Sequence, residues 1–159
     1  MRYNTNKRNR RFQIEVNKNG GETMKIVCVD DHPIMLQGIA QNIRGILPEA
    51  SVHTFNSGEK ALDFMKNNVC DVLISEIELC GMNGLALARN AKKLNSELNV
   101  IFLTVCDEGE YAREVFSIRP SGYLVKPASR EQLAFELKNL RYGVNTKTIC
   151  SQNYQKIKF

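Results

Sequence analysis

Acidic, hydroxyl and basic side chains follow four apolar segments of this sequence, each at the point where the segment ends. They are Asp30 and Asp31 after residues 25–29, Glu76 after 72–75, Thr104 after 100–103 and Lys126 after 122–125. Carboxylates gathered in one place suit a hard, oxygen-preferring cation such as Mg²⁺. A lysine and a hydroxyl beside them would bind phosphoryl oxygens. These residue types therefore predict a metal and phosphoryl site, provided that the fold brings them together.

The segments that must position these residues alternate between strand and helix patterns. Strands are predicted at 25–29, 51–55, 72–75, 100–103 and 122–125. Apolar residues three to four positions apart predict helices at 33–47, 59–67, 85–94 and 108–117, and a last helix behind Ser129, which has a capping-box partner in Gln132. An acidic residue before Pro33 is expected to cap the first helix.

This alternation is typical of an α/β fold with a doubly wound, five-stranded parallel sheet of (βα)5 type. The segment 72–75 is apolar on both faces, as a central parallel strand must be. Ligands of such sheets bind beyond the carboxyl ends of the strands. Glu76 stands at that end of the central strand, so the chemistry is expected around it.

The basic charge of the chain lies mostly outside this pattern. The net charge is +5, and residues 1–23 hold six Lys or Arg against two Glu, which leaves +1 for the rest. We expect residues 1–23 to be a basic, disordered extension, 24–142 to be the domain, and 143–159 to be a short tail with no output domain. Binding of nucleic acid through the two tails stays an alternative, although no DNA-binding motif accompanies the charge.

The cysteines and the hydropathy exclude several classes of protein. The five cysteines form no C-x-x-C pair and the two histidines show no metal-binding spacing. Cys28 and Cys70 adjoin predicted strands and are expected to be buried thiols. No secretory signal or long apolar run is present, so a cytoplasmic protein without a membrane span is predicted.

Four stretches of the chain resemble the receiver domain of bacterial two-component response regulators. They are VCVDDHPIMLQGI, DVLISEIELCGMNGLALA, VIFLTV and SGYLVKP, in the family's order and spacing between Met24 and about Arg141. The resemblance implies the flavodoxin-like receiver fold. It also implies functional roles: Asp30, Asp31 and the carbonyl of Glu78 as Mg²⁺ ligands beside position 76, Thr104 and Tyr123 as switch residues, Lys126 as the phosphate-pairing lysine, and a cis bond before Pro127.

Glu76 departs from the family pattern, because the family carries its phospho-accepting aspartate at this position. The extra methylene moves the carboxylate outward by roughly 1.5 Å, and phosphoryl transfer depends strongly on positioning. We therefore predict that phosphorylation is lost or very slow and that Mg²⁺ binding is weak or absent. Glu76 could reach Lys126 and Thr104 and mimic the phosphorylated state, belong to an inert site, or be an ordinary solvent-exposed carboxylate. Cys80, where the family commonly has proline, is a second departure that could loosen the neighbouring loop.

The resemblance implies signalling through proteins rather than catalysis. A sensor histidine kinase or another signalling protein is the expected partner, and a dimer could form through the face of the fourth helix, fifth strand and fifth helix, which includes Tyr111, Phe116 and Tyr123. The stretch 121–142 looks like the receiver ends of DNA-binding transcriptional regulators. One rival is a conventional receiver phosphorylated at Glu76 or at a neighbour such as Ser75. Another is a Mg²⁺-dependent phosphotransfer enzyme or nuclease, for which no general base is evident.

Overall fold

A computed structural model describes residue 20 and residues 23–106 and 109–141 of the chain. Apart from residues 20 and 23, the predicted basic extension lies outside the described residues, and so does the predicted tail 143–159. Within the described part, no helix is both long enough and apolar enough to span a membrane.

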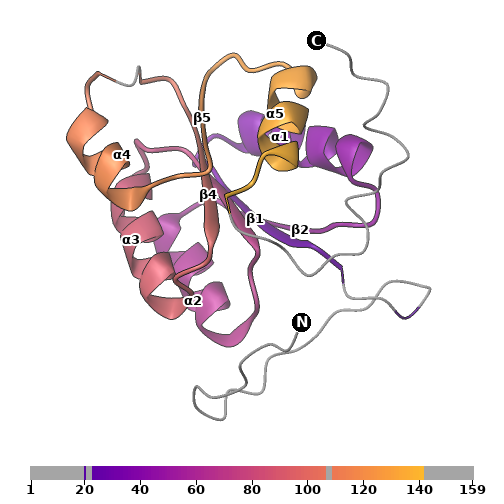
Figure 1. Ribbon diagram of the computed structural model, residues 1–159, viewed down its shortest axis with the longest axis horizontal. Helices are drawn as coiled ribbons and strands as arrows, with labels where there is room; N and C mark the ends of the chain where they lie inside the picture. The colour runs from indigo at the N-terminus through magenta and orange to yellow at the C-terminus, as the bar shows by residue number, and fades with distance from the viewer. Residues whose placement is uncertain (1–19, 21–22, 107–108, 142–159) are drawn as a thin grey trace.

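Five strands and five helices alternate along the described chain (Figure 1). In order they are β1 (Lys25–Val29), α1 (Pro33–Ile46), β2 (Ser51–Phe55), α2 (Gly58–Asn67), β3 (Val72–Ser75), α3 (Gly84–Leu94), β4 (Asn99–Thr104), α4 (Ala112–Ile118), β5 (Gly122–Val125) and α5 (Arg130–Lys138). Each predicted strand is present, so the predicted alternation is confirmed.

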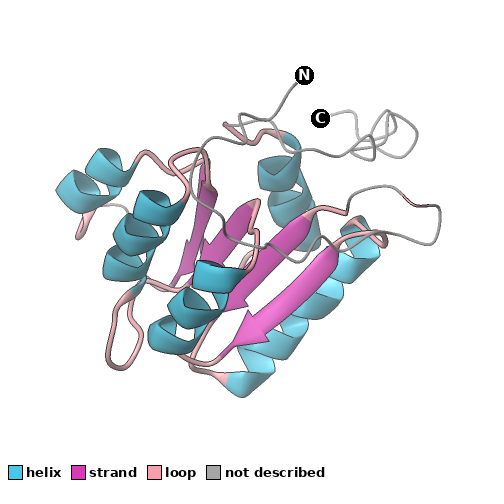
Figure 2. Cartoon of the chain, turned by 90° about the horizontal axis from the view of Figure 1, so that it is seen from below, coloured by secondary structure: helices cyan, strands magenta, loops and turns pink. Residues whose placement is uncertain are grey.

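The strands form one parallel sheet in the order β2-β1-β3-β4-β5. Helices α1 and α5 lie on one face of the sheet, and α2, α3 and α4 lie on the other (Figures 1 and 2). Strand β3 is central and all four of its residues are buried, as its apolar sequence predicts. The doubly wound parallel sheet expected from the sequence is therefore confirmed.

The two faces of the sheet bury separate apolar cores. One core gathers side chains of α2, α3 and the facing strand residues around Leu73 and Phe102, and the other packs α1 and α5 against the opposite strand residues around Ile26 and Ile74. Cys28 and Cys70 are buried thiols, as predicted, and burial raises the pKa of Cys28 to about 12. Two packed faces hold the strand ends rigidly in register.

Two local predictions were wrong. The first helix is capped by His32 rather than by an acidic residue, and His32 makes no side-chain cap hydrogen bond. Helix α4 begins at Ala112, later than the predicted start at residue 108, which is itself outside the described residues. Phe116, which was placed on the expected partner face, is 82% exposed. The capping box of α5 is present as predicted.

Candidate functional site

The register of the sheet brings the ends of four strands together. Val29 of β1 pairs with Ser75 of β3, so the residues that follow them, Asp30 and Glu76, leave the sheet side by side. On the other side, Thr104 of β4 pairs with Val125 of β5, and the Lys126 N–H donates to the Thr104 carbonyl over 2.7 Å. The chain therefore delivers the predicted site residues to one edge of the sheet.

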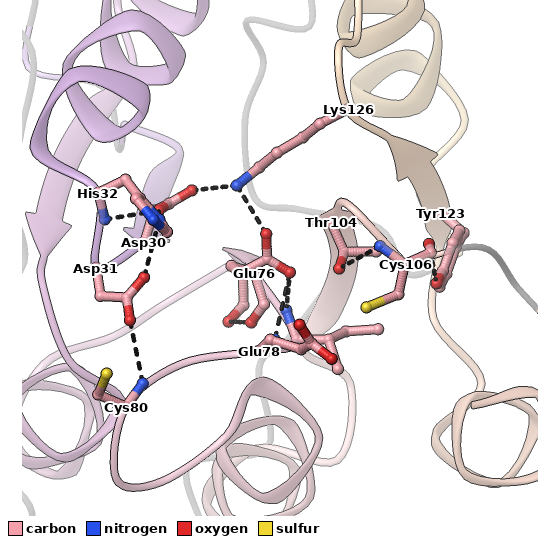
Figure 3. Close-up of polar contacts among 12 residues, drawn as sticks. Asp30, Asp31, His32, Glu76, Glu78, Cys80, Thr104, Cys106, Tyr123 and Lys126 are labelled. Atoms are coloured by element: carbon pink, nitrogen blue, oxygen red, sulfur yellow. Dashed lines mark hydrogen bonds and ion pairs between the residues drawn. The ribbon is translucent and has the colours of Figure 1, made fainter. Parts of the chain in front are cut away.

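Asp30, Glu76 and Lys126 form a buried group that we call the ion cluster (Figure 3). The Lys126 ammonium lies 2.5 Å from Asp30 Oδ2 and 2.7 Å from Glu76 Oε2. The lysine side chain is 7% exposed, Glu76 is 3% exposed and Asp30 is fully buried. Burial alone would lower the pKa of Lys126, but its hydrogen bonds to the two carboxylates raise that pKa above the ordinary value. Lys126 is therefore the cation that compensates both buried carboxylates.

The Glu76 carboxylate is committed at both oxygens. Its Oε1 atom accepts from the Ile77 N–H at 2.7 Å and from the Glu78 N–H at 3.3 Å, while Oε2 faces Lys126. Helix α3 begins at Gly84, which lies against the backbone of Glu76. A Cβ atom at Gly84 would overlap the Glu76 carbonyl. Glu76 is thus a buried and fixed carboxylate, and the expectation of an ordinary solvent-exposed group was wrong.

Asp31 lies apart from the ion cluster and contacts the loop after β3. Its Oδ2 atom accepts from the Cys80 N–H at 3.1 Å. Burial would raise the pKa of Asp31, but the hydrogen bonds from the N–H and thiol of Cys80 and the charge of His32 lower it. The same loop is held a second time where the Met82 N–H donates to Glu59 Oε1 at 2.6 Å. Cys80 therefore anchors the loop that it was expected to loosen.

Thr104, Cys106 and Tyr123 form a second group, the Cys106 group, on the β4–β5 side of Glu76 (Figure 3). The Cys106 N–H donates to Thr104 Oγ1 at 3.3 Å, and the Tyr123 hydroxyl donates to the Cys106 carbonyl at 2.9 Å. Among the described residues, no hydrogen bond joins Thr104 to Glu76. Contact between Glu76 and Lys126 is therefore present, whereas the other contact expected of a phosphorylation mimic is missing.

The two remaining predicted residues flank these groups. The Glu78 carboxylate accepts from the Tyr111 hydroxyl at 3.0 Å, and that hydrogen bond raises the pKa of Tyr111 to about 12. The peptide bond between Lys126 and Pro127 is cis. Glu78 and Tyr111 connect the loop after β3 to the start of α4.

The oxygen donors at this edge suit Mg²⁺ in kind. Mg²⁺ needs a near-octahedral set of oxygens and is commonly held through carboxylates. Asp31 Oδ1 is the single buried polar side-chain atom without a hydrogen bond in the described part of the chain, although His32 Nδ1 lies 3.1 Å away. A cation would satisfy that atom. The oxygens of the ion cluster, by contrast, already face protein donors and would have to exchange them for metal.

Three contacts at this edge were missed by the sequence analysis. Asp30 Oδ1 accepts from the His32 N–H at 2.8 Å, and the position of His32 beside the acidic pair was a signal that could have been used. The Tyr111–Glu78 and Glu59–Met82 contacts join residues far apart in the sequence and carry no motif. Only the fold places them at the site.

Comparison with known proteins matches most of this chain to one family. The sequence profile of the response regulator receiver domain matches residues 26–138. The heme response regulator HssR of Staphylococcus epidermidis is 30% identical over 140 residues, which cover 82% of this chain and 61% of that protein. The response regulator GacA of Pseudomonas aeruginosa is 24% identical over 120 residues, 76% of this chain and 56% of GacA. The matched part thus spans little more than half the length of these curated relatives.

Several solved structures share the fold of this chain. The chemotaxis protein CheY4 of Vibrio cholerae superposes with a TM-score of 0.67 at 24% identity, over 73% of this chain and 97% of CheY4. The BeF3-activated receiver domain of DrrB superposes with a TM-score of 0.66 at 26% identity, over 73% of this chain and 95% of that domain.

Proposed function

Because this chain belongs to the response regulator receiver domain family, we propose that it is a pseudo-receiver, which signals through protein contacts and does not accept a phosphoryl group efficiently. Its fold is the flavodoxin-like receiver fold, and receiver domains serve two-component signal transduction. The proposal concerns what Glu76 does at the position of the phospho-accepting aspartate.

The state of the Glu76 carboxylate carries this proposal. In-line transfer requires a carboxylate oxygen that is free to attack and aligned with the phosphorus. Both oxygens of Glu76 are engaged, one by two backbone N–H groups and the other by Lys126, in a side chain that is 3% exposed. To attack, the carboxylate would have to leave both sets of partners. Ser75 offers no substitute, because it is fully buried and donates to the Glu76 carbonyl.

Mg²⁺ binding is proposed to be weak. Asp30, Asp31, Glu76 and the Glu78 carbonyl would hold the ion, and when bound it would neutralise the charge on oxygens at this edge. Lys126 already supplies positive charge between Asp30 and Glu76. The gain from adding a second cation is correspondingly smaller.

Protein partners are proposed to bind the face that carries exposed apolar side chains. Phe116 of α4 is 82% exposed, and Val105, Val125 and Phe135 are also exposed on the elements around the edge strand β5. A second copy of the chain or a sensor histidine kinase would fit such a face. Sedimentation of Phe116→Lys against Ile34→Lys, an equally exposed change on α1, tests the dimer: loss of self-association is expected for the first variant alone.

We further propose that the chain acts in the cytoplasm, has no enzymatic turnover and shares descent with transcriptional regulators. The support is the resemblance of residues 121–142 to receiver ends of such regulators and the thiol form of the four cysteines that the structure describes.

The test of the pseudo-receiver is phosphorylation by a small phosphodonor such as acetyl phosphate, followed by intact mass spectrometry. Wild type is expected to gain no phosphoryl mass, whereas Glu76→Asp gains one because its shorter side chain cannot keep both sets of contacts. Glu76→Ala is the blank. Label on wild type that disappears in Glu76→Ala would overturn the proposal.

A further inference from the structure

The loop after β3 places a backbone donor next to the acidic pair. The Cys80 N–H points at Asp31 Oδ2 over 3.1 Å (Figure 3). A proline at this position would have no N–H to offer. The donor is therefore a consequence of the residue type at position 80, although the atom that donates belongs to the backbone.

The loop cannot easily move this donor away. Two residues further on, the Met82 N–H is held by Glu59 at 2.6 Å. Gly81 between them has a φ of +78°, and a Cβ there would strike the Glu59 carboxylate. Two carboxylates from two different segments thus fix successive parts of the same loop, and the Cys80 N–H is presented to Asp31 in a set position.

The two oxygens of the Asp31 carboxylate differ in their hydrogen bonding. Oδ2 is taken by Cys80, whereas Oδ1 is buried and has no hydrogen bond among the described residues. A divalent cation that used Oδ1 would also draw on the charge of Oδ2. The Cys80 N–H competes for that charge, because a hydrogen bond to an ionised group is stronger than one between neutral groups.

We propose that Cys80 is a positioning residue that holds Asp31 against the loop through its backbone N–H and thereby weakens divalent-cation binding at this edge of the sheet. The inference rests on the proposed function, since it concerns the metal affinity of the same site. Two departures then act together: Lys126 and Glu76 satisfy each other inside the ion cluster, and Cys80 satisfies Asp31 outside it.

The first experiment compares Mg²⁺ affinity in three proteins by amide chemical-shift titration, which detects weak binding. Cys80→Pro removes the N–H, whereas Cys80→Ala removes the thiol and keeps the N–H. We expect Cys80→Pro to bind Mg²⁺ about tenfold more tightly than Cys80→Ala, and wild type, which also has the thiol, to bind it no more tightly than Cys80→Ala. Equal affinity in the two variants would overturn the proposal.

The second experiment does not depend on whether the proline variant folds. Amide hydrogen exchange is measured at Cys80 and Met82, the two anchored positions of the loop. Asp31→Ala should speed exchange at Cys80 by about tenfold or more and leave Met82 unchanged, and Glu59→Ala should do the reverse. In wild type, Mg²⁺ should also speed exchange at Cys80. Exchange at Cys80 that ignores Asp31→Ala would overturn the proposal.

The two proposals, the role of Cys80 and the pseudo-receiver, can fail independently. Phosphoryl label on wild-type Glu76 would overturn the pseudo-receiver, yet it would leave the Mg²⁺ comparison of the Cys80 variants intact. Equal Mg²⁺ affinities would remove the role of Cys80 while an unlabelled Glu76 still supports the pseudo-receiver.

Discussion

The ion cluster and the Cys106 group lie at the same edge of the sheet but are built on different principles. The ion cluster joins side chains from the ends of β1, β3 and β5, and its lysine pairs with two carboxylates that are distant from it in sequence. The Cys106 group is neutral, and two of its hydrogen bonds run to the backbone of Cys106 itself. One group couples three strands, whereas the other is largely satisfied within the end of β4 and the neighbouring strand.

This difference predicts that the ion cluster contributes more to stability and that the Cys106 group rearranges more easily. Buried charges cost several kcal/mol when a partner is lost, so the ion cluster is expected to resist rearrangement. A neutral hydrogen bond contributes only about 1 kcal/mol, so the Cys106 group can change partners cheaply. Among the described residues, no hydrogen bond joins Thr104 to Glu76, so the Glu76 carboxylate has no direct side-chain hydrogen bond to the Cys106 group. The charges of the ion cluster are thus paired without a hydrogen bond to the side chains of the Cys106 group.

The largest expected effect comes from removing the cation of the ion cluster. Lys126→Met would leave Asp30 and Glu76 as neighbouring buried carboxylates without compensation. We expect the free energy of unfolding, measured by urea denaturation at neutral pH, to fall by about 3 kcal/mol or more. Lys66→Met is the control, since Lys66 forms only an exposed pair with Asp63 and should change stability by less than about 0.5 kcal/mol. A loss below about 1 kcal/mol in Lys126→Met would show that the cluster is not held by its lysine.

A smaller effect is expected on the other side of the comparison. Tyr123→Phe removes the hydroxyl that donates to the Cys106 carbonyl at 2.9 Å, in a half-buried setting. The free energy of unfolding should fall by about 1 kcal/mol, and the outcome of the phosphodonor test at Glu76 should be the same as in wild type. A loss as large as that of Lys126→Met would erase the distinction between the two groups.

The sequence predicted the parts of this contrast that follow from strand ends. Asp30, Glu76 and Lys126 each follow an apolar run, and parallel strands bring their carboxyl ends together, so the convergence was predictable. The burial of Glu76 was not, because it depends on two N–H groups and on Gly84 packing against its carbonyl. Three-dimensional packing decides whether a strand-end carboxylate faces solvent or protein.

Two missed contacts to the loop after β3 each join a carboxylate to a backbone N–H group that is distant in sequence. The Cys80 N–H is a backbone donor, and residue types reveal such donors only where proline removes them. Glu59 reaches Met82 across 23 positions without any periodic pattern. The fourth helix was predicted to start at residue 108, but α4 begins at Ala112. Apolar spacing marks a helical segment without fixing its first residue.

Tyr111 offers the finest test, because its bond to Glu78 crosses from α4 to the loop that carries the Glu76 partners. The bond raises the pKa of Tyr111 to about 12, against about 10 for an unperturbed tyrosine. Folding therefore favours the neutral phenol, so its contribution to stability is complete below about pH 10 and is lost as the pH rises from there through about 12. Phenolate absorbance should show a late-titrating component that is absent in Tyr111→Phe and shifts toward pH 10 in Glu78→Gln. If Glu78→Gln leaves that titration in place, Glu78 is not what holds the phenol, and no side-chain bond joins α4 to the loop beside Glu76.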